Sequence, residues 1–207
     1  MTRAVSKNFA FIAVSNLLAP MFSLVLVLAI SRLQGVETLG KYSLLMSVFV
    51  FGMSAAGFGL PVVLTREAAQ TPRDAGRWFL NAVVLSTGLA LPLLAIALVA
   101  CALRASDSDM ALALGLTALT VLPSAVTQCA EAVLLAFEHA RDFVVINLGE
   151  TAVRAVIGTI LVLAGYGVVA IAVLLLALRL VAAVVGPPRV RAGLHLLEFA
   201  NLLLVGV

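Results

Sequence analysis

The feature that most constrains this chain is a series of long apolar runs separated by short polar turns. The first two runs flank a polar stretch at residues 34–41, and the second run covers residues 42–64. An α-helix rises ~1.5 Å per residue, so about 20 apolar residues cross the ~30 Å hydrocarbon core of a bilayer. These runs predict a transmembrane hairpin joined by a polar turn. A loop is expected after it, containing Arg66, Arg73 and Arg77.

The composition indicates the same class of protein. Hydrophobic residues make up 63% of the chain and charged residues only 11%, whereas soluble domains carry ~25% charged residues. Strands of a membrane barrel would alternate apolar and polar residues with a period of two, which these runs do not. We therefore predict an all-α polytopic membrane protein, a six-helix transmembrane bundle surrounded by membrane lipid. The formal net charge of +3 is spread over the loops and does not point to a nucleic-acid partner.

Six membrane-spanning helices are predicted within one bundle over residues 1–188. They cover residues 9–31, 42–64, 79–103, 110–135, 143–164 and 167–186. Pro187 and Pro188 end the sixth helix, because proline does not continue a helix. Residues 189–207 are expected to be cytoplasmic at their start. They then form either an amphipathic helix on the membrane surface or the opening turns of an incomplete seventh span.

The distribution of lysine and arginine predicts the orientation, because these residues are enriched in cytoplasmic loops. With the N-terminus in the cytoplasm, the outer loops hold only Arg32, Lys41 and Arg104. The inner segments then hold Arg3, Lys7, Arg66, Arg73, Arg77, Arg141, Arg189 and Arg191. The N-terminus is therefore expected to be cytoplasmic. Trp78 and Tyr42, near predicted span ends, are expected to act as anchors at the membrane interface.

Polar side chains inside the predicted spans are the candidate functional residues, because an ionisable group at membrane depth costs about 2.5–3.5 kcal/mol. The candidates are Gln128, Glu131, Asn147, Glu150, Arg154 and Arg179. Those on the fifth span recur at steps of three and four residues, which places them on one face of the helix. On the fourth span, Thr120, Ser124 and Thr127 extend the polar stripe. The charges are expected to converge on the inner half of the bundle.

Two interpretations of this cluster are open. In the first, Glu150 neutralises one of the two arginines and the cluster only helps the helices to associate. In the second, the polar stripes line a water-filled cavity. There the arginines, with Asn147 and Gln128, bind an anionic substrate, while Glu131 or Glu150 binds a coupling proton or sodium ion.

Enzymatic activity is not expected. The segment 52–55 loosely resembles the serine motif of a rhomboid-type intramembrane protease, which needs a histidine base at membrane depth. His139 and His195 lie outside the predicted spans. The sequence contains no phosphate-binding glycine-rich loop, no metal-ligand cluster and no CxxC motif. We therefore expect no cofactor and no metal site.

Short motifs around the first hairpin resemble those of the polysaccharide flippases. These are the O-antigen and exopolysaccharide translocases of the multidrug/oligosaccharidyl-lipid/polysaccharide exporter superfamily. Their pattern is R-x-L-G-x-x-x-F-G-x-Y, a helix, G-L, and then an Arg-Glu-Ala loop. The matching pieces are Arg32-Leu33-Gln34-Gly35, Leu39-Gly40-Lys41-Tyr42, Gly57-Phe58-Gly59-Leu60 and Thr65-Arg66-Glu67-Ala68. Gln34 and Leu39 depart from the pattern.

The resemblance implies one half of a flippase fold, in which two six-helix bundles face each other across a cationic cavity. It implies translocation of an undecaprenyl-linked sugar across the plasma (inner) membrane of a bacterium, by a truncated or half-size unit. A second bundle, from a homodimer or a C-terminal half, would be required. Arg154 and Arg179 fit the cationic cavity by type and depth. The alternatives are a cation-coupled drug or metabolite exporter of the same superfamily, and a non-transporting membrane fragment.

Overall fold

The computed structural model describes residues 2–103, 108–137 and 140–184, which are almost entirely helical. The elements in chain order are α1 (Thr2–Leu33), α2 (Gly35–Gly57), α3 (Leu60–Gln70), the short 3-10 helix η1 (Pro72–Asp74), α4 (Ala75–Leu103), α5 (Ser108–Ala136), α6 (Ala140–Leu163) and a helix over Val168–Val184, called here the 168–184 helix. The described residues contain no strand, and the predicted all-α fold is confirmed. The segment 189–207, predicted as an amphipathic helix or partial span, lies outside the described residues.

The surface of the bundle is that of a protein dissolved in lipid. Five stretches are long and apolar enough to cross a membrane: Ala13–Leu33, Gly35–Gly57, Pro72–Ala97, Ser108–Ala136 and Phe143–Leu163. The 168–184 helix is apolar but shorter. Large apolar side chains face outward, among them Leu17, Phe51 and Val84, which are 71%, 76% and 72% exposed. Such a surface is stable against acyl chains and unstable against water. The chain is therefore a multi-pass membrane protein.

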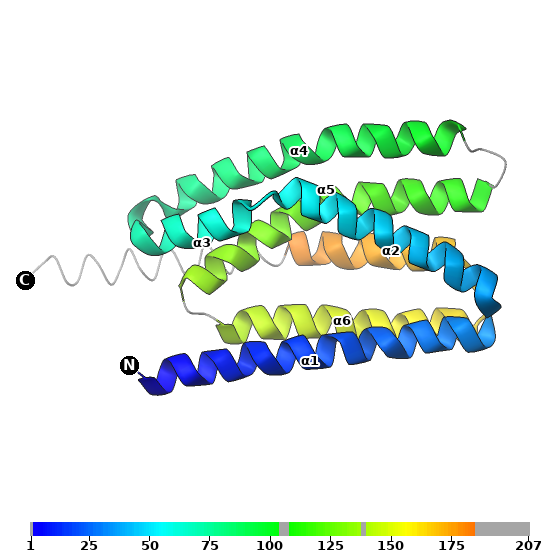
Figure 1. Cartoon of the computed structure of the whole chain (residues 1–207), viewed down its shortest axis with the longest axis horizontal. Helices are drawn as coiled ribbons and strands as arrows, with labels where there is room; N and C mark the ends of the chain where they lie inside the picture. The colour runs from blue at the N-terminus through cyan, green and yellow to red at the C-terminus, as the bar shows by residue number, and fades with distance from the viewer. Residues whose placement is uncertain (1, 104–107, 138–139, 185–207) are drawn as a thin grey trace, which may run out of the picture.

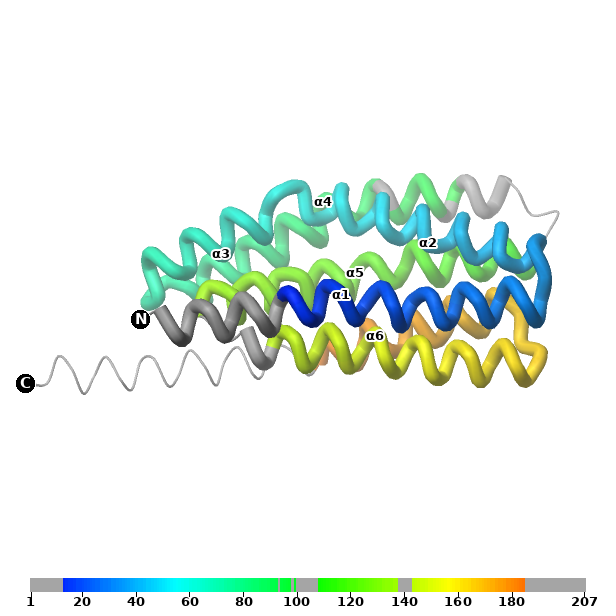
Figure 2. The backbone as a smooth tube through the Cα atoms, turned by 60° about the horizontal axis from the view of Figure 1, so that its bottom comes forward, coloured from blue at the N-terminus to red at the C-terminus, as the bar shows by residue number. Residues whose placement is uncertain are grey.

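The helices form two groups. α1 packs along the length of α6, whereas α2 and α3 pack against α4 and α5. Figure 1 shows α1 and α6 side by side along one edge of the bundle and α4 along the opposite edge, and Figure 2 shows α1 beside α6 from another direction. Direct contact between α5 and α6 is sparse. The described bundle thus consists of an α1–α6 pair, a group made of α2, α3, α4 and α5, and the 168–184 helix, whose Ile171 and Leu175 are buried in the core.

Close packing of the α1–α6 pair depends on a glycine. A Cβ atom added to Gly158 of α6 would lie 2.9 Å from Leu26 Cδ1 of α1, closer than carbon atoms pack. Leu26 is 1% exposed, in a core cluster that also contains Tyr42. Tyr42 itself is only 6% exposed. The prediction that Tyr42 anchors at the interface is therefore wrong, because its ring packs between helices inside the bundle.

The turn between α1 and α2 is shorter than the sequence predicts. Gly35, with φ of +84°, already begins α2, so the stretch 35–41 is helical. Glu37 and Lys41 pair across one helical turn at 3.2 Å, which supports a helix where polar composition had indicated a loop. Gln34 Nε2 donates to the Tyr166 carbonyl at 2.7 Å. This bond fastens the turn to the connection that precedes the 168–184 helix.

A break divides the second predicted span into two helices. α2 ends at Gly57, Phe58 and Gly59 have φ of 32° and 79°, and α3 starts at Leu60. Glycine adopts positive φ without steric cost, whereas a phenylalanine there is strained. The Phe58 side chain is 82% exposed and points away from the bundle core. The run 42–64 is therefore not one continuous helix.

α3 continues through the segment that was predicted to be an arginine-containing loop. Arg66 is helical within α3, Arg73 lies in η1, and Arg77 lies in the first turns of α4. Leu64 and Ala68 lie one helical turn apart and both are buried. Their burial stabilises helix where the charged residues had suggested an irregular loop. The three arginines consequently lie around one corner of the bundle, between α3 and α4.

The helix break is stabilised by a hydroxyl group from a neighbouring helix. A helix end leaves backbone carbonyls without intrahelical partners. Phe58 N–H donates to the Ser54 carbonyl at 3.0 Å, and Ser86 Oγ of α4 donates to the Ala56 carbonyl at 3.1 Å. Ser86 is 0% exposed. α4 thus supplies a hydrogen bond that the break would otherwise leave unmade inside the membrane.

We predict that Ser86→Ala lowers the free energy of unfolding by about 1–3 kcal/mol, because it leaves a buried carbonyl unpaired. Thermal unfolding of the purified protein in detergent measures the effect. Ser47→Ala is the matched control, since Ser47 is exposed and its hydroxyl bonds to its own helix at 2.8 Å. Equal stability of the two variants would contradict a capping role for Ser86.

Candidate functional site

Arg179, on the 168–184 helix, is the centre of the polar cluster. Its Nε atom lies 3.0 Å from Glu150 Oε1 of α6, and the two side chains are 17% and 10% exposed. Arg179 Nη1 donates to Thr127 Oγ1 of α5 at 3.4 Å. The guanidinium carbon lies 5.7 Å from the ring centroid of Phe49 of α2, within the range of a cation–π interaction. One side chain therefore contacts α2, α5 and α6.

The Arg179–Glu150 contact is an ion pair by distance rather than an aligned hydrogen bond. The Nε–H direction misses the carboxylate, and buried Nε has no hydrogen-bond partner among the described residues. Coulomb attraction depends on separation and local dielectric, not on the direction of the N–H bond. The pair is thus held mainly by charge, and the Nε–H donor has no hydrogen-bond partner among the described residues.

Glu131 places a second carboxylate near this pair. It lies one helical turn from Thr127 on α5, and its charge interacts with both Arg179 and Glu150. Arg179 and Glu150 carry opposite charges, so their ion pair has no net positive charge. The sequence left open whether Glu150 pairs with Arg154 or with Arg179, and the contact is with Arg179.

Arg154 occupies a separate position on α6. The sequence places Glu150 and Arg154 one helical turn apart, yet Glu150 pairs with Arg179. In the part of the chain that the structure describes, Arg154 forms no ion pair. Its half-buried side chain is near enough to act electrostatically on Tyr42 of α2. Among the described residues, therefore, no carboxylate contacts the Arg154 guanidinium.

The two predicted amide residues, Gln128 and Asn147, make no described contact with the Arg179–Glu150 ion pair. Gln128 faces the helix break: its Oε1 would lie 2.8 Å from a Cβ added to Gly57, and it has no hydrogen-bond partner among the described residues. Asn147 is half-buried on α6, and its backbone carbonyl accepts a hydrogen bond from Thr151 Oγ1 at 2.9 Å. The cluster therefore consists of Arg179, Glu150 and Glu131.

Part of the α5 polar stripe packs in the protein interior. Thr120 and Ser124 are 0% exposed, and their hydroxyl groups donate to carbonyls one turn earlier in their own helix, at 2.8 and 2.7 Å. These residues do not line a water-filled cavity. Phe49 was missed by the sequence reasoning, because an apolar residue in an apolar run carries no signal that it faces a cation.

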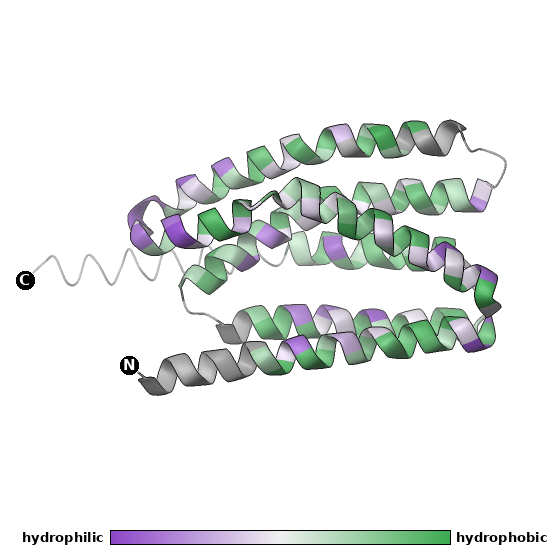
Figure 3. Cartoon of the chain, viewed as in Figure 1, coloured by the Kyte–Doolittle hydropathy of each residue, from purple (hydrophilic) through white to green (hydrophobic). Residues whose placement is uncertain are grey.

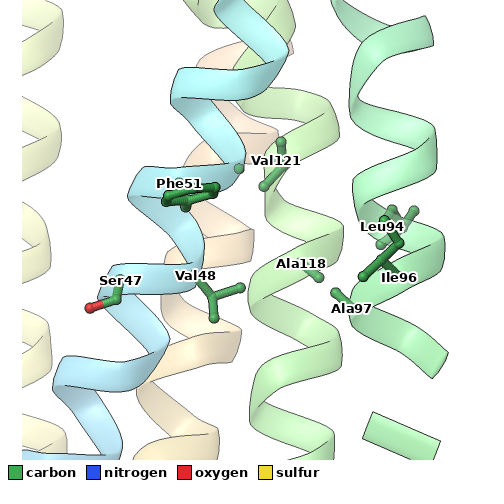
Figure 4. Close-up of a pocket in the computed structure, with 9 residues that line it drawn as sticks. Ser47, Val48, Phe51, Leu94, Ile96, Ala97, Ala118 and Val121 are labelled. Atoms are coloured by element: carbon green, nitrogen blue, oxygen red, sulfur yellow. The ribbon is translucent and has the colours of Figure 1, made fainter. Parts of the chain in front are cut away.

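An apolar groove of about 380 Å³ lies between α2, α4 and α5, apart from the charged cluster. Its lining residues are Ser47, Val48, Phe51, Gly52, Leu94, Ile96, Ala97, Ala118 and Val121 (Figure 4). Ser47 is the one polar side chain among them, and its hydroxyl already bonds to the Ser43 carbonyl. A groove with so few hydrogen-bonding groups does not hold ordered water. An apolar hydrocarbon chain fits the lining of this groove better than water does.

The fold and the buried charges define a class of protein: a multi-pass helical membrane protein with ionisable groups in its interior. The described residues contain no group of His, Cys, Asp and Glu side chains that could hold a metal ion. Residues 27–196 match the sequence model of a family described as polysaccharide biosynthesis proteins. The match covers most of the chain, and the chain belongs to this family, which confirms the predicted family resemblance. No curated protein and no solved structure matches the chain.

We predict that Arg179→Gln lowers the free energy of unfolding by about 3–5 kcal/mol, because it leaves the Glu150 carboxylate buried without its cation. Arg154→Gln should lower the free energy of unfolding much less, because no described carboxylate would lose an ion-pair partner. Unfolding of the purified proteins in mixed detergent micelles compares the two variants.

The double variant Glu150→Gln/Arg179→Gln distinguishes charge from shape. It removes both charges of the ion pair and should recover most of the stability that Arg179→Gln loses. The reason is that Glu150 is then no longer a buried carboxylate without its cation. Additive losses in the double variant would show that the two side chains stabilise the bundle independently of each other.

Proposed function

We propose that this protein takes part in translocating a lipid-linked oligosaccharide across the bacterial plasma membrane. The observation that carries the proposal is Arg154, a cation at membrane depth without an ion-pair contact among the described residues, in a member of a polysaccharide biosynthesis family. Counted along α6 at ~1.5 Å per residue, Arg154 lies about 14 Å from the end of the helix at Leu163. An ionisable group at that depth requires a partner.

The chemistry of the expected substrate matches this free charge. Oligosaccharides of this kind are attached to their polyprenyl carrier through a phosphate or pyrophosphate group. A guanidinium binds phosphate oxygens through paired, charge-assisted hydrogen bonds. Arg154 would therefore contact the phosphate, while the neutral sugars pass through a hydrated space.

The two arginines have different roles in this proposal. Arg179 is occupied by Glu150 and holds helices together, so it is not the first contact for an incoming anion. Glu131 and Glu150 are the groups that would bind a coupling proton or sodium ion, because a change in their charge alters the balance around Arg179. Asn147 and Gln128 would contribute amide groups to sugar binding.

The proposal includes a second six-helix bundle. A single bundle presents Arg154 at one wall, and a substrate pathway needs an opposite wall to exclude lipid. A second copy of the chain or a further segment would provide that wall. The proposal has the N-terminus in the cytoplasm, as the distribution of lysine and arginine predicts. Translocation without covalent change is expected, so the protein is not proposed to be an enzyme.

The test is transport of fluorescently labelled undecaprenyl-pyrophosphate sugar across liposomes that contain the full chain. Arg154→Gln should reduce the rate by about tenfold or more, because one charge-assisted contact of about 1.5–3 kcal/mol is lost. Arg154→Lys, which keeps the charge but not the planar fork, should recover part of the rate.

The same assay separates the alternative substrates. A cationic drug would be moved at least as well by Arg154→Gln, since the substitution removes a repelling charge. Full sugar transport by Arg154→Gln at equal reconstituted amount would contradict the proposal, as would a wild-type chain that fails to move labelled sugar with or without a second bundle.

A further inference from the structure

The corner where α3 is joined to α4 has a pocket, formed by η1 and the first turns of α4, that the proposed translocation does not use. The pocket has a volume of about 260 Å³ and is lined by Asp74, Arg77, Trp78 and Asn81. Hydrophilic residues gather at this corner of the bundle in Figure 3. From its chemistry we propose that it binds the headgroup of a phospholipid carrying both a phosphate and a primary ammonium group, an ethanolamine phospholipid.

The pocket lies where lipid headgroups are found. The apolar stretch Pro72–Ala97 starts at this corner, so the corner is at one end of a membrane-crossing helix. Trp78 is 39% exposed, and its indole Nε1–H donates to Thr71 Oγ1 at 3.2 Å. Tryptophan is enriched at the boundary between acyl chains and headgroups. The hydrogen bond fixes the indole ring as one wall of the pocket.

Both charges of the pocket are available to a ligand. Arg77 Nη1 and Asp74 Oδ1 are 3.7 Å apart, and their side chains are 85% and 54% exposed. An ion pair this long and this exposed contributes little energy of its own. Exchanging it for contacts to a ligand therefore costs little.

The combination of charges selects the headgroup. A lone phosphate would be attracted by Arg77 and repelled by Asp74, and a lone amine would meet the reverse. A headgroup with both charges satisfies both side chains: the guanidinium binds the phosphate, and the carboxylate accepts hydrogen bonds from the ammonium. Ethanolamine donates three such bonds, whereas the trimethylated nitrogen of choline has no hydrogen to donate. The exposed Asn81 side chain adds a further acceptor.

Trp78 makes binding at this site measurable, because it is the one tryptophan in the chain. The full chain is reconstituted in phosphatidylcholine vesicles, and phosphatidylethanolamine or phosphatidylglycerol replaces increasing fractions of the lipid. Trp78 emission should change and saturate with phosphatidylethanolamine at a lower fraction than with phosphatidylglycerol. Soluble glycerophosphoethanolamine added to phosphatidylcholine vesicles should produce the same change if the headgroup alone is recognised.

Two substitutions locate the two contacts. Asp74→Asn should weaken the response to phosphatidylethanolamine by about twofold to fivefold, the value of one solvent-exposed charged contact, and abolish the preference over phosphatidylglycerol. Arg77→Gln should weaken the response to both lipids. Glu37→Gln is the matched control, because it removes the carboxylate of another exposed ion pair, in α2, and should leave both titrations unchanged.

Three results would overturn the assignment. Equal or stronger response to phosphatidylglycerol would mean that the corner recognises phosphate alone. An unchanged titration for Asp74→Asn would remove the ammonium contact. If Glu37→Gln altered the phosphatidylethanolamine titration as much as Asp74→Asn does, the Trp78 emission would report the net charge of the protein and not binding in this pocket. Circular dichroism of each variant confirms that the helices are intact.

Discussion

The buried ion pair between Arg179 and Glu150 joins the two groups of helices at membrane depth, together with an apolar core that contains Leu26 of α1 and Tyr42 of α2. α1 and α6 form one packed pair, α2 to α5 form another group, and direct contact between α5 and α6 is sparse. The 168–184 helix bridges them through a guanidinium that contacts α6, α5 and α2. Removing two charges from water is costly, and their attraction offsets that cost only while both are present. The ion pair therefore couples the position of α6 to that of its neighbours.

Backbone polar groups inside the membrane, like buried charges, need a partner within the protein. No water is available in the hydrocarbon core to satisfy a broken helix, so another protein group must do so. Ser86 fills this role at the end of α2, while Thr120 and Ser124 return their hydroxyl groups to their own helix. These three hydroxyl groups thus satisfy backbone carbonyls inside the membrane.

Two arginines of similar depth acquire different properties from their neighbours. Arg179 forms an ion pair with Glu150, whereas Arg154 has no ion-pair contact in the described structure. An anion would meet less competition at Arg154. The apolar groove between α2, α4 and α5 is free of charge, and the headgroup pocket at the α3–α4 corner carries both signs. The buried charges, the apolar groove and the headgroup pocket therefore lie in three different parts of the bundle.

The class of protein, the helical architecture and the set of buried ionisable residues follow from the sequence alone. The reason is that run length and helical periodicity are local properties that can be compared directly with bilayer thickness. Family membership also had a local signal, in the motifs around the first hairpin. The tertiary structure alone decided that Glu150 pairs with Arg179 instead of Arg154, that Tyr42 is buried, and that α2 breaks at Phe58. Each of these depends on how one helix is rotated and packed against another, and the spacing of residues within a single helix does not determine that.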